Sequence, residues 1–143
     1  MIMFRKIALL KYDESNKKTI AHLEDGEVMY LEEKPMDLIE HWCIYNGSTA
    51  IGRMKAFNIL TGSTQKPAVL INERSRIVFF PTLSMKDKDC VWLNDQKILQ
   101  TKTIDAFHTE ITFITGYKII IDSNRRTIEN QIRRCKKFLS CIE

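Results

Sequence analysis

The first clear hydrophobic pattern in the chain is a pair of short apolar runs separated by a turn sequence. The runs occupy residues 19–23 and 28–31, and Glu24-Asp25-Gly26-Glu27 lies between them. An Asp-Gly pair readily adopts the positive φ angles that a tight turn between antiparallel strands requires. The pattern therefore predicts a β-hairpin.

Two segments after this hairpin have the three- and four-residue periodicity of amphipathic helices. In the first, apolar residues recur from Pro35 to Cys43, and Asn46-Gly47 ends the run. The second extends from Ser48 to Phe57 and contains Gly52, and a glycine inside a helix costs about 1 kcal/mol relative to alanine. This second segment is either a helix or a loop that breaks at the glycine.

Short apolar runs rich in β-branched and aromatic residues follow Pro67 and predict a series of strands. They occupy residues 68–71, 77–80, 90–93, 97–99, 110–114 and 117–121. Thr115-Gly116 separates the last two runs, which makes them the best hairpin in the chain.

The last segment predicts a helix that begins near Asp122 or Ser123, because either side chain can accept hydrogen bonds from the first turn. The apolar stripe of this helix consists of Ile128, Ile132, Cys135, Leu139 and Ile142. The cationic side opposite consists of Arg126, Arg133 and Lys137, with Arg134 beside them. One side can pack on a core, while the other is either a solvated helix back or a surface for an anionic partner.

Together these elements predict an α+β fold, with an antiparallel β-sheet core, short amphipathic helices and a C-terminal basic amphipathic helix. We expect residues 1–143 to form a single domain, because the chain has 44% apolar residues and shows neither a linker nor a repeat. No apolar run approaches the ~18 residues of a membrane span, and no secretion signal is visible. We therefore expect a cytoplasmic protein without membrane contact, whose four cysteines are reduced and buried or half-buried.

The net charge of +4 is distributed unevenly along the chain. Residues 1–47 hold six Lys and Arg against nine Asp and Glu, whereas residues 48–122 hold ten against seven and residues 123–143 hold six against two. An acidic first third is thus joined to a basic remainder. This asymmetry is typical of a protein with one face that meets a polyanion, although an unevenly charged solvated surface fits it about equally well.

Catalytic and metal-binding patterns are weak. The three histidines have no recognisable nucleophile or orienting partner, and no Gly-x-Ser-x-Gly motif or phosphate-binding glycine loop occurs. His41-x-Cys43 and Cys135-x5-Cys141 lack the close ligand pairs of structural zinc sites. We expect a protein that is not an enzyme and that needs no metal or other cofactor.

Six short sequence strings, which occur in order between about residues 40 and 138, are more informative about function than the composition and charge of the chain. The two most specific are Phe79-Phe80-Pro81-Thr82-Leu83-Ser84 and Thr127-Ile128-Glu129-Asn130-Gln131 with Arg134. The others are Cys43 with Gly47, Ser48, Gly52 and Arg53, then Lys66-Pro67, then Cys90-x-Trp92, then Thr109-Glu110-Ile111-Thr112-Phe113 with Gly116. In order and spacing they resemble the competence transcription factor family, ComK.

The resemblance implies a bacterial, nucleoid-associated transcription activator of competence (DNA-uptake) genes. Its implied partner is A/T-rich double-stranded DNA bound through the minor groove by homodimers or larger assemblies, and RNA polymerase is a further candidate partner. Narrow A/T-rich minor grooves attract inserted Arg and Lys, so this mode needs no recognition helix. Longer relatives continue into a tail associated with adaptor-guided proteolysis, and the resemblance does not extend such control to this chain.

The candidate DNA contacts are basic residues of the segments described above. They are Arg53, Lys55, Lys66, Arg74, Arg76, Arg126, Arg133, Arg134 and Lys137. Arg53 ranks first because it is a motif residue whose charge is costly to bury, with an internal ion pair as a close alternative. Arg74 and Arg76 lie in a predicted turn that either reaches a groove or is solvated.

A second hypothesis belongs to a different functional class. A short family member that does not bind DNA would act by pairing with another protein. Its contact surface would be the acidic first third of the chain or the stripe of Ile132, Leu139 and Ile142.

Overall fold

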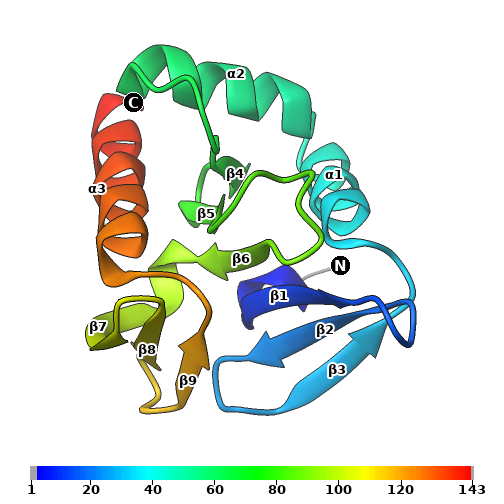
Figure 1. The fold of residues 1–143 in the computed structure, drawn as a ribbon. Coiled ribbons are helices and arrows are strands. Elements are labelled where there is room, and N and C mark those ends of the chain that lie inside the picture. The colour runs from blue at the N-terminus through cyan, green and yellow to red at the C-terminus, as the bar shows by residue number, and fades with distance from the viewer. Residues whose placement is uncertain (1–2, 143) are drawn as a thin grey trace.

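The computed structural model describes residues 3–142, which form two antiparallel sheets and three α-helices (Figure 1). The larger sheet has the strand order β3-β2-β1-β6-β5-β4. Its strands are β1 (Ile7–Asp13), β2 (Lys18–Leu23), β3 (Val28–Leu31), β4 (Val69–Asn72), β5 (Ile77–Pro81) and β6 (Val91–Asn94). The smaller sheet has the order β7-β8-β9, with β7 (Ile98–Asp105), β8 (His108–Phe113) and β9 (Lys118–Ile121). The predicted α+β class with antiparallel strands is confirmed.

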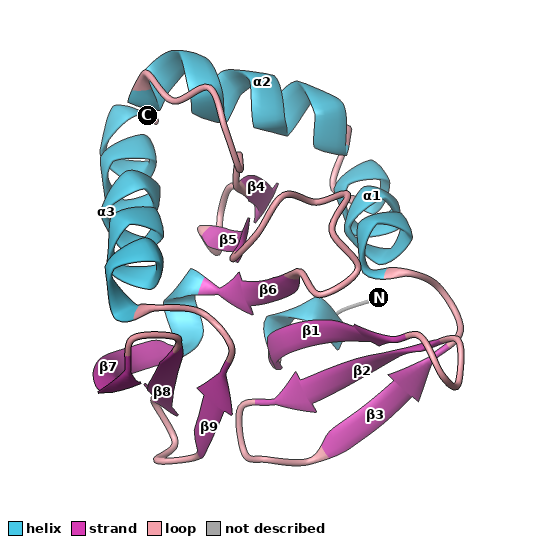
Figure 2. Ribbon diagram, in the orientation of Figure 1, coloured by secondary structure: helices cyan, strands magenta, loops and turns pink. Residues whose placement is uncertain are grey.

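The helices are α1 (Pro35–Tyr45), α2 (Ala50–Thr61) and α3 (Arg125–Cys141), and they form an arch around β4, β5 and β6 (Figure 2). Short 3-10 turns span Met3–Arg5 and Asp95–Lys97. Alternate residues of β5 point to opposite faces of the larger sheet. Phe79 therefore joins a cluster beneath α1, whereas Phe80 joins a second cluster shared with α3 and the smaller sheet. Phe80 and Trp92 are core residues, as predicted.

The hairpins predicted from turn chemistry are present. β2 pairs with β3 in the register Ala21↔Met29, and β8 pairs with β9 in the register Ile111↔Ile119. β1 was not predicted as a strand. It lies in the middle of the larger sheet between β2 and β6, and residues 7–10 are buried on both faces, so the run lacks the alternation that marks a half-exposed strand.

The segment around Gly52 is one continuous helix, which settles the alternative left open by the sequence. Thr49 caps α2, because its side chain accepts a hydrogen bond from the Gly52 N–H at 3.1 Å. A Cβ atom at Gly52 would lie 3.1 Å from the same hydroxyl oxygen. The glycine therefore allows the close approach of the cap in the first turn of the helix.

The predicted cap of α3 was wrong by one or two residues. Asn124 is the cap, since its side chain accepts from the Thr127 N–H at 2.8 Å. Ser123 is buried, and its carbonyl oxygen accepts a 2.7 Å hydrogen bond from the Thr109 hydroxyl. Ser123 thus joins α3 to the smaller sheet instead of capping the helix.

The turn between β2 and β3 fastens the two sheets together. Lys97 Nζ lies 2.6 Å from Glu24 Oε2, and the Tyr117 hydroxyl lies 3.0 Å from His22 Nδ1. A Cβ atom on Gly26 would come within 3.0 Å of the Tyr117 ring. This contact links the first hairpin of the chain to the β8–β9 turn.

Three of the four cysteines are buried, as predicted, but Cys141 is exposed because it lies on the outer side of the last turn of α3. Burial raises the pKa of Cys43 to about 11 and that of Cys135 well above its ordinary value. Within residues 3–142 no group of three or more potential metal ligands converges. None of the described helices has the length and apolar character to traverse a bilayer.

Candidate nucleic-acid interface

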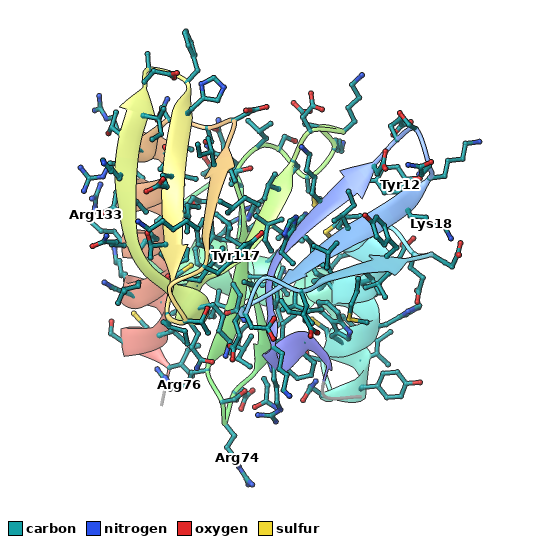
Figure 3. All side chains as sticks on the ribbon, turned by 90° about the horizontal axis from the view of Figure 1, so that it is seen from below. Tyr12, Lys18, Arg74, Arg76, Tyr117 and Arg133 are labelled. Atoms are coloured by element: carbon teal, nitrogen blue, oxygen red, sulfur yellow. The ribbon has the colours of Figure 1, made fainter. Side chains whose placement is uncertain are left out.

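The outer side of α3 is basic, and its inner side belongs to the core. The helix carries six Arg and Lys residues against one Glu. Arg126, Arg133 and Lys137 are exposed, and Figure 3 shows Arg133 directed away from the body of the molecule. Ile128 and Cys135 are fully buried on the opposite side. The division predicted from helical periodicity is therefore present, and it leaves a row of cations facing solvent.

A buried amide, Gln131, joins three of the resemblance motifs at one point that we call the Gln131 junction. Its Nε2 donates to the carbonyl oxygens of Lys66 at 3.0 Å and Pro81 at 2.8 Å. Its Oε1 accepts a 3.0 Å hydrogen bond from Arg134 Nη1. Gln131 is 1% exposed, and its bond to Pro81 is buried whereas those to Lys66 and Arg134 are partly buried. The junction brings Arg134 on α3 next to the loop that carries Lys66.

A surface cavity of about 520 Å³ opens beside this junction. Its lining comes from residues 64–67 and from residues 81 and 83–86. Lys66 and Lys86 both line it, and Lys66 adopts a left-handed backbone with φ of 49°. Lys86 was not predicted, although it lies only two residues beyond the Phe-Pro-Thr-Leu-Ser string. Two lysines that line one cavity suit a phosphate oxygen.

Arg74 and Arg76 occupy the turn between β4 and β5, as expected. Arg74 projects from the tip of this turn (Figure 3). Arg76 has a φ of 57°, and its Nη2 donates to the carbonyl oxygen of Leu139 in the last turn of α3. Lys137 Nζ lies 3.4 Å from the carbonyl oxygen of Thr61 at the end of α2. Arg76 and Lys137 therefore hold α3 against its neighbours while remaining exposed.

Arg53 lies in the internal ion pair that the sequence left as an alternative. Its Nη1 is 3.1 Å from Glu73 Oε1, and its Nε donates to the Ser48 hydroxyl at 3.1 Å. The side chain is only 17% exposed. Lys55, two residues further along α2, is exposed. The structure thus separates Arg53 from the cations of α3 and gives it a role in joining α2 to the β4–β5 turn.

Two further cations on α3, Arg125 and Lys136, were missed by sequence reasoning. They line a cavity of about 380 Å³ with Glu129 and Asp95 on the side of α3 that faces β7. Burial raises the pKa of Asp95 to about 6, and nearby Lys136 opposes that rise. Arg125 Nε donates to the Thr101 hydroxyl at 3.0 Å. Since this flank holds carboxylates as well as cations, the uncompensated charge lies on the outer side of α3 and at the Gln131 junction.

Comparison with known proteins agrees with the arrangement of these motifs. Residues 1–143 match the family described as ComK protein. The chain belongs to the ComK family. A relative named "Competence transcription factor" from Bacillus subtilis (strain 168) is 27% identical over 128 residues, which cover 90% of this chain and 67% of that protein. No solved structure matches. The predicted ComK resemblance, which rested on residues 40 to 138, is confirmed and extends over the whole chain.

Proposed function

We propose that this ComK family member is a transcription factor that binds A/T-rich double-stranded DNA and activates competence genes. The name of the Bacillus subtilis relative and the family membership support the transcriptional role. The observation that carries the DNA-binding part is the outer side of α3, where exposed cations lie opposite a fully buried stripe. It acts without a catalytic step.

Most of the candidate cations remain available to bind phosphates. Of the nine candidate residues, Arg53 alone lies in an ion pair within residues 3–142. Cations without carboxylate partners neutralise phosphates and release condensed counterions, which is the main sequence-independent source of DNA affinity. The row on α3 therefore supplies the backbone contacts.

The Gln131 junction supports contact through the minor groove. It holds Arg134 beside the loop of Lys66, where Lys66 and Lys86 share a cavity. A guanidinium restrained by a buried amide loses little conformational freedom when it enters a groove. A/T-rich tracts narrow the minor groove and strengthen its negative potential, so they attract such a side chain preferentially. We assign the phosphate contacts to Arg126, Arg133 and Lys137, and the groove contact to Arg134.

The same proposal includes the cellular setting. The protein acts in the cytoplasm on the nucleoid, assembles as a homodimer or larger on paired A/T-rich boxes, and contacts RNA polymerase at the promoter. Paired boxes match a symmetric protein, because two copies related by a twofold axis present the same surface to each box.

The direct test is fluorescence anisotropy with an A/T-box duplex and a G·C-rich duplex over a series of salt concentrations. Log affinity should fall linearly with log salt, and the A/T duplex should bind more tightly. Replacing both Arg126 and Arg133 with Ala should lower the magnitude of the salt slope by about 2, because each neutralised phosphate contributes roughly 0.9. A small ligand that occupies the minor groove should compete.

The matched control is the double variant Lys6→Ala/Lys11→Ala, which removes the same charge from exposed positions at and next to β1. It should leave the salt slope unchanged. Equal loss in both double variants would show that net charge, not the α3 surface, determines binding. Absence of salt-dependent affinity for either duplex would refute the proposal.

The alternative hypothesis, a protein-interaction module, named two contact surfaces, and one of them is weakened by core packing. The stripe of Ile132, Leu139 and Ile142 packs against the core cluster that contains Phe138, so it does not offer a surface for pairing. Some acidic side chains of the first third pair locally, as Glu32 does with Lys18 and Glu33 with His41. The salt titration separates the two hypotheses, since a pairing module predicts little DNA affinity at any modest salt.

A further inference from the structure

The hairpin between β7 and β8 ends in an aromatic side chain that the fold leaves uncovered. Asp105 pairs with His108, so Ala106 and Phe107 alone form the loop. Phe107 is 75% exposed, and Ile104 on the same hairpin is 46% exposed. Figure 3 shows this end of the hairpin projecting beyond the neighbouring elements at the upper left. The projecting tip is thus apolar on a protein whose adjacent helix is strongly basic.

The tip is held rigidly. Asp105 Oδ1 accepts a hydrogen bond from the Phe107 N–H at 2.8 Å and another from His108 Nδ1 at 2.8 Å. His108 Nε2 lies 3.2 Å from Asp122 Oδ1. The hydrogen bond to Asp105 raises the pKa of His108. These bonds fix the backbone that carries Phe107, so little freedom is lost when the ring inserts into a site.

The hairpin is also attached to the basic helix. The Thr101 hydroxyl of β7 donates to Glu129 Oε2 at 3.0 Å and accepts from Arg125 Nε at 3.0 Å. From Thr101 to Phe107 a strand extends about 20 Å at ~3.3 Å per residue. The hairpin is therefore joined to α3 at Thr101, and Lys102 is an exposed cation on the hairpin between that contact and the tip.

We propose that Phe107, supported by Ile104, is a wedge that inserts between base pairs from the minor groove and kinks the DNA bound by α3. This inference rests on the proposed function, because it names how the same surface deforms its DNA. Apolar side chains partly unstack a base step in other minor-groove proteins, and the bend they cause increases contact with the protein. DNA is the occupant that the neighbouring cations favour, since Lys102 lies on the same hairpin and Thr101 joins that hairpin to Arg125 of the basic helix. Flexible pyrimidine–purine steps kink most easily, so the preferred insertion site is a TA or CA step.

The test compares wild type with Phe107→Ala and Phe107→Leu on an A/T-box duplex that carries fluorophores at both ends and 2-aminopurine at successive positions. Wild type should shorten the end-to-end distance and raise 2-aminopurine emission at one step. Phe107→Ala should lose both signals and weaken binding by about tenfold or more, with an unchanged salt slope because no phosphate contact is removed. Phe107→Leu should retain most of the bend. Ile59→Ala, at an α2 side chain that is 69% exposed, is the matched control and should behave as wild type.

The outcomes separate this inference from the proposed function. If Phe107→Ala binds and bends the duplex as wild type does, the wedge is refuted while the DNA-binding role stands. If the variant loses association with another protein instead, with DNA parameters unchanged, the tip is a protein contact and the wedge is likewise refuted. If wild type shows no salt-dependent DNA affinity, both proposals fail. Thermal unfolding of each variant verifies that the fold is retained.

Discussion

At the scale of single residues, Gln131 is the polar side chain on which the candidate site depends most. Its amide satisfies two buried carbonyl oxygens and one guanidinium. Gln131→Ala leaves these groups without partners and should lower the free energy of unfolding by about 1 to 3 kcal/mol. Urea denaturation measures the loss. Asn130→Ala, one position away, is the control and should stay within about 0.5 kcal/mol of wild type; equal losses would show that the junction is not structural.

Two histidines should titrate in opposite directions from the ordinary pKa of 6.5. Burial, with a smaller effect from Lys11, lowers the pKa of His22, whereas the hydrogen bond to Asp105 raises that of His108. Protonated His108 stabilises the fold below pH 6.5, and this contribution is lost as the pH rises through its folded pKa. Neutral His22 stabilises the fold above pH 6.5, and this contribution is lost as the pH falls from 6.5 through its folded pKa.

NMR titration of the two imidazole rings measures this separation. Asp105→Asn should return the His108 pKa toward 6.5 and leave that of His22 unchanged. A single common pKa for both rings in wild type would contradict the described environments.

At the scale of secondary-structure elements, the ion pair between Arg53 and Glu73 joins α2 to the β4–β5 turn. Arg53→Ala should lower the free energy of unfolding by about 1 kcal/mol, because it also breaks the hydrogen bond to Ser48. It should leave the salt slope of DNA binding unchanged. Chemical denaturation and the anisotropy titration test both statements, and a reduced slope with unchanged stability would restore Arg53 as a DNA contact.

The contact between the β2–β3 and β8–β9 turns gives a second prediction at this scale. Gly26 has a φ of 96°, and a Cβ atom there would lie 3.0 Å from Tyr117. Gly116 has nearly the same φ, 94°, but a Cβ atom there would meet nothing within 4 Å. Both Gly→Ala variants carry backbone strain of about 1 kcal/mol or more, and Gly26→Ala should cost more because the ring must also move. A larger loss of melting temperature for Gly116→Ala would contradict this docking.

At the scale of the whole molecule, local patterns predicted most of the helices and strands but not their assembly. The Asp25-Gly26 turn and the period of α3 are local signals, and both the first hairpin and the two-sided helix are present. β1 was missed because residues 7–10 are buried on both faces. The Gln131 junction could not be predicted from local sequence patterns, since its carbonyl partners at Lys66 and Pro81 are 65 and 50 residues away in the sequence. The partner of Arg53 was missed for the same reason.

The position of β1 in the larger sheet also has a consequence for folding during synthesis, because its neighbour β6 is translated much later than β1. β1 emerges from the ribosome before the other strands of the larger sheet, yet one of its two neighbours, β6, begins only at Val91. Until then the exposed edge of β1 is open to pairing with other chains. α3 is made later still, so its cations emerge only after the segment that completes the sheet has been translated. A nascent chain that stalls before Val91 therefore poses a risk of aggregation but lacks the basic helix to which we assign DNA binding.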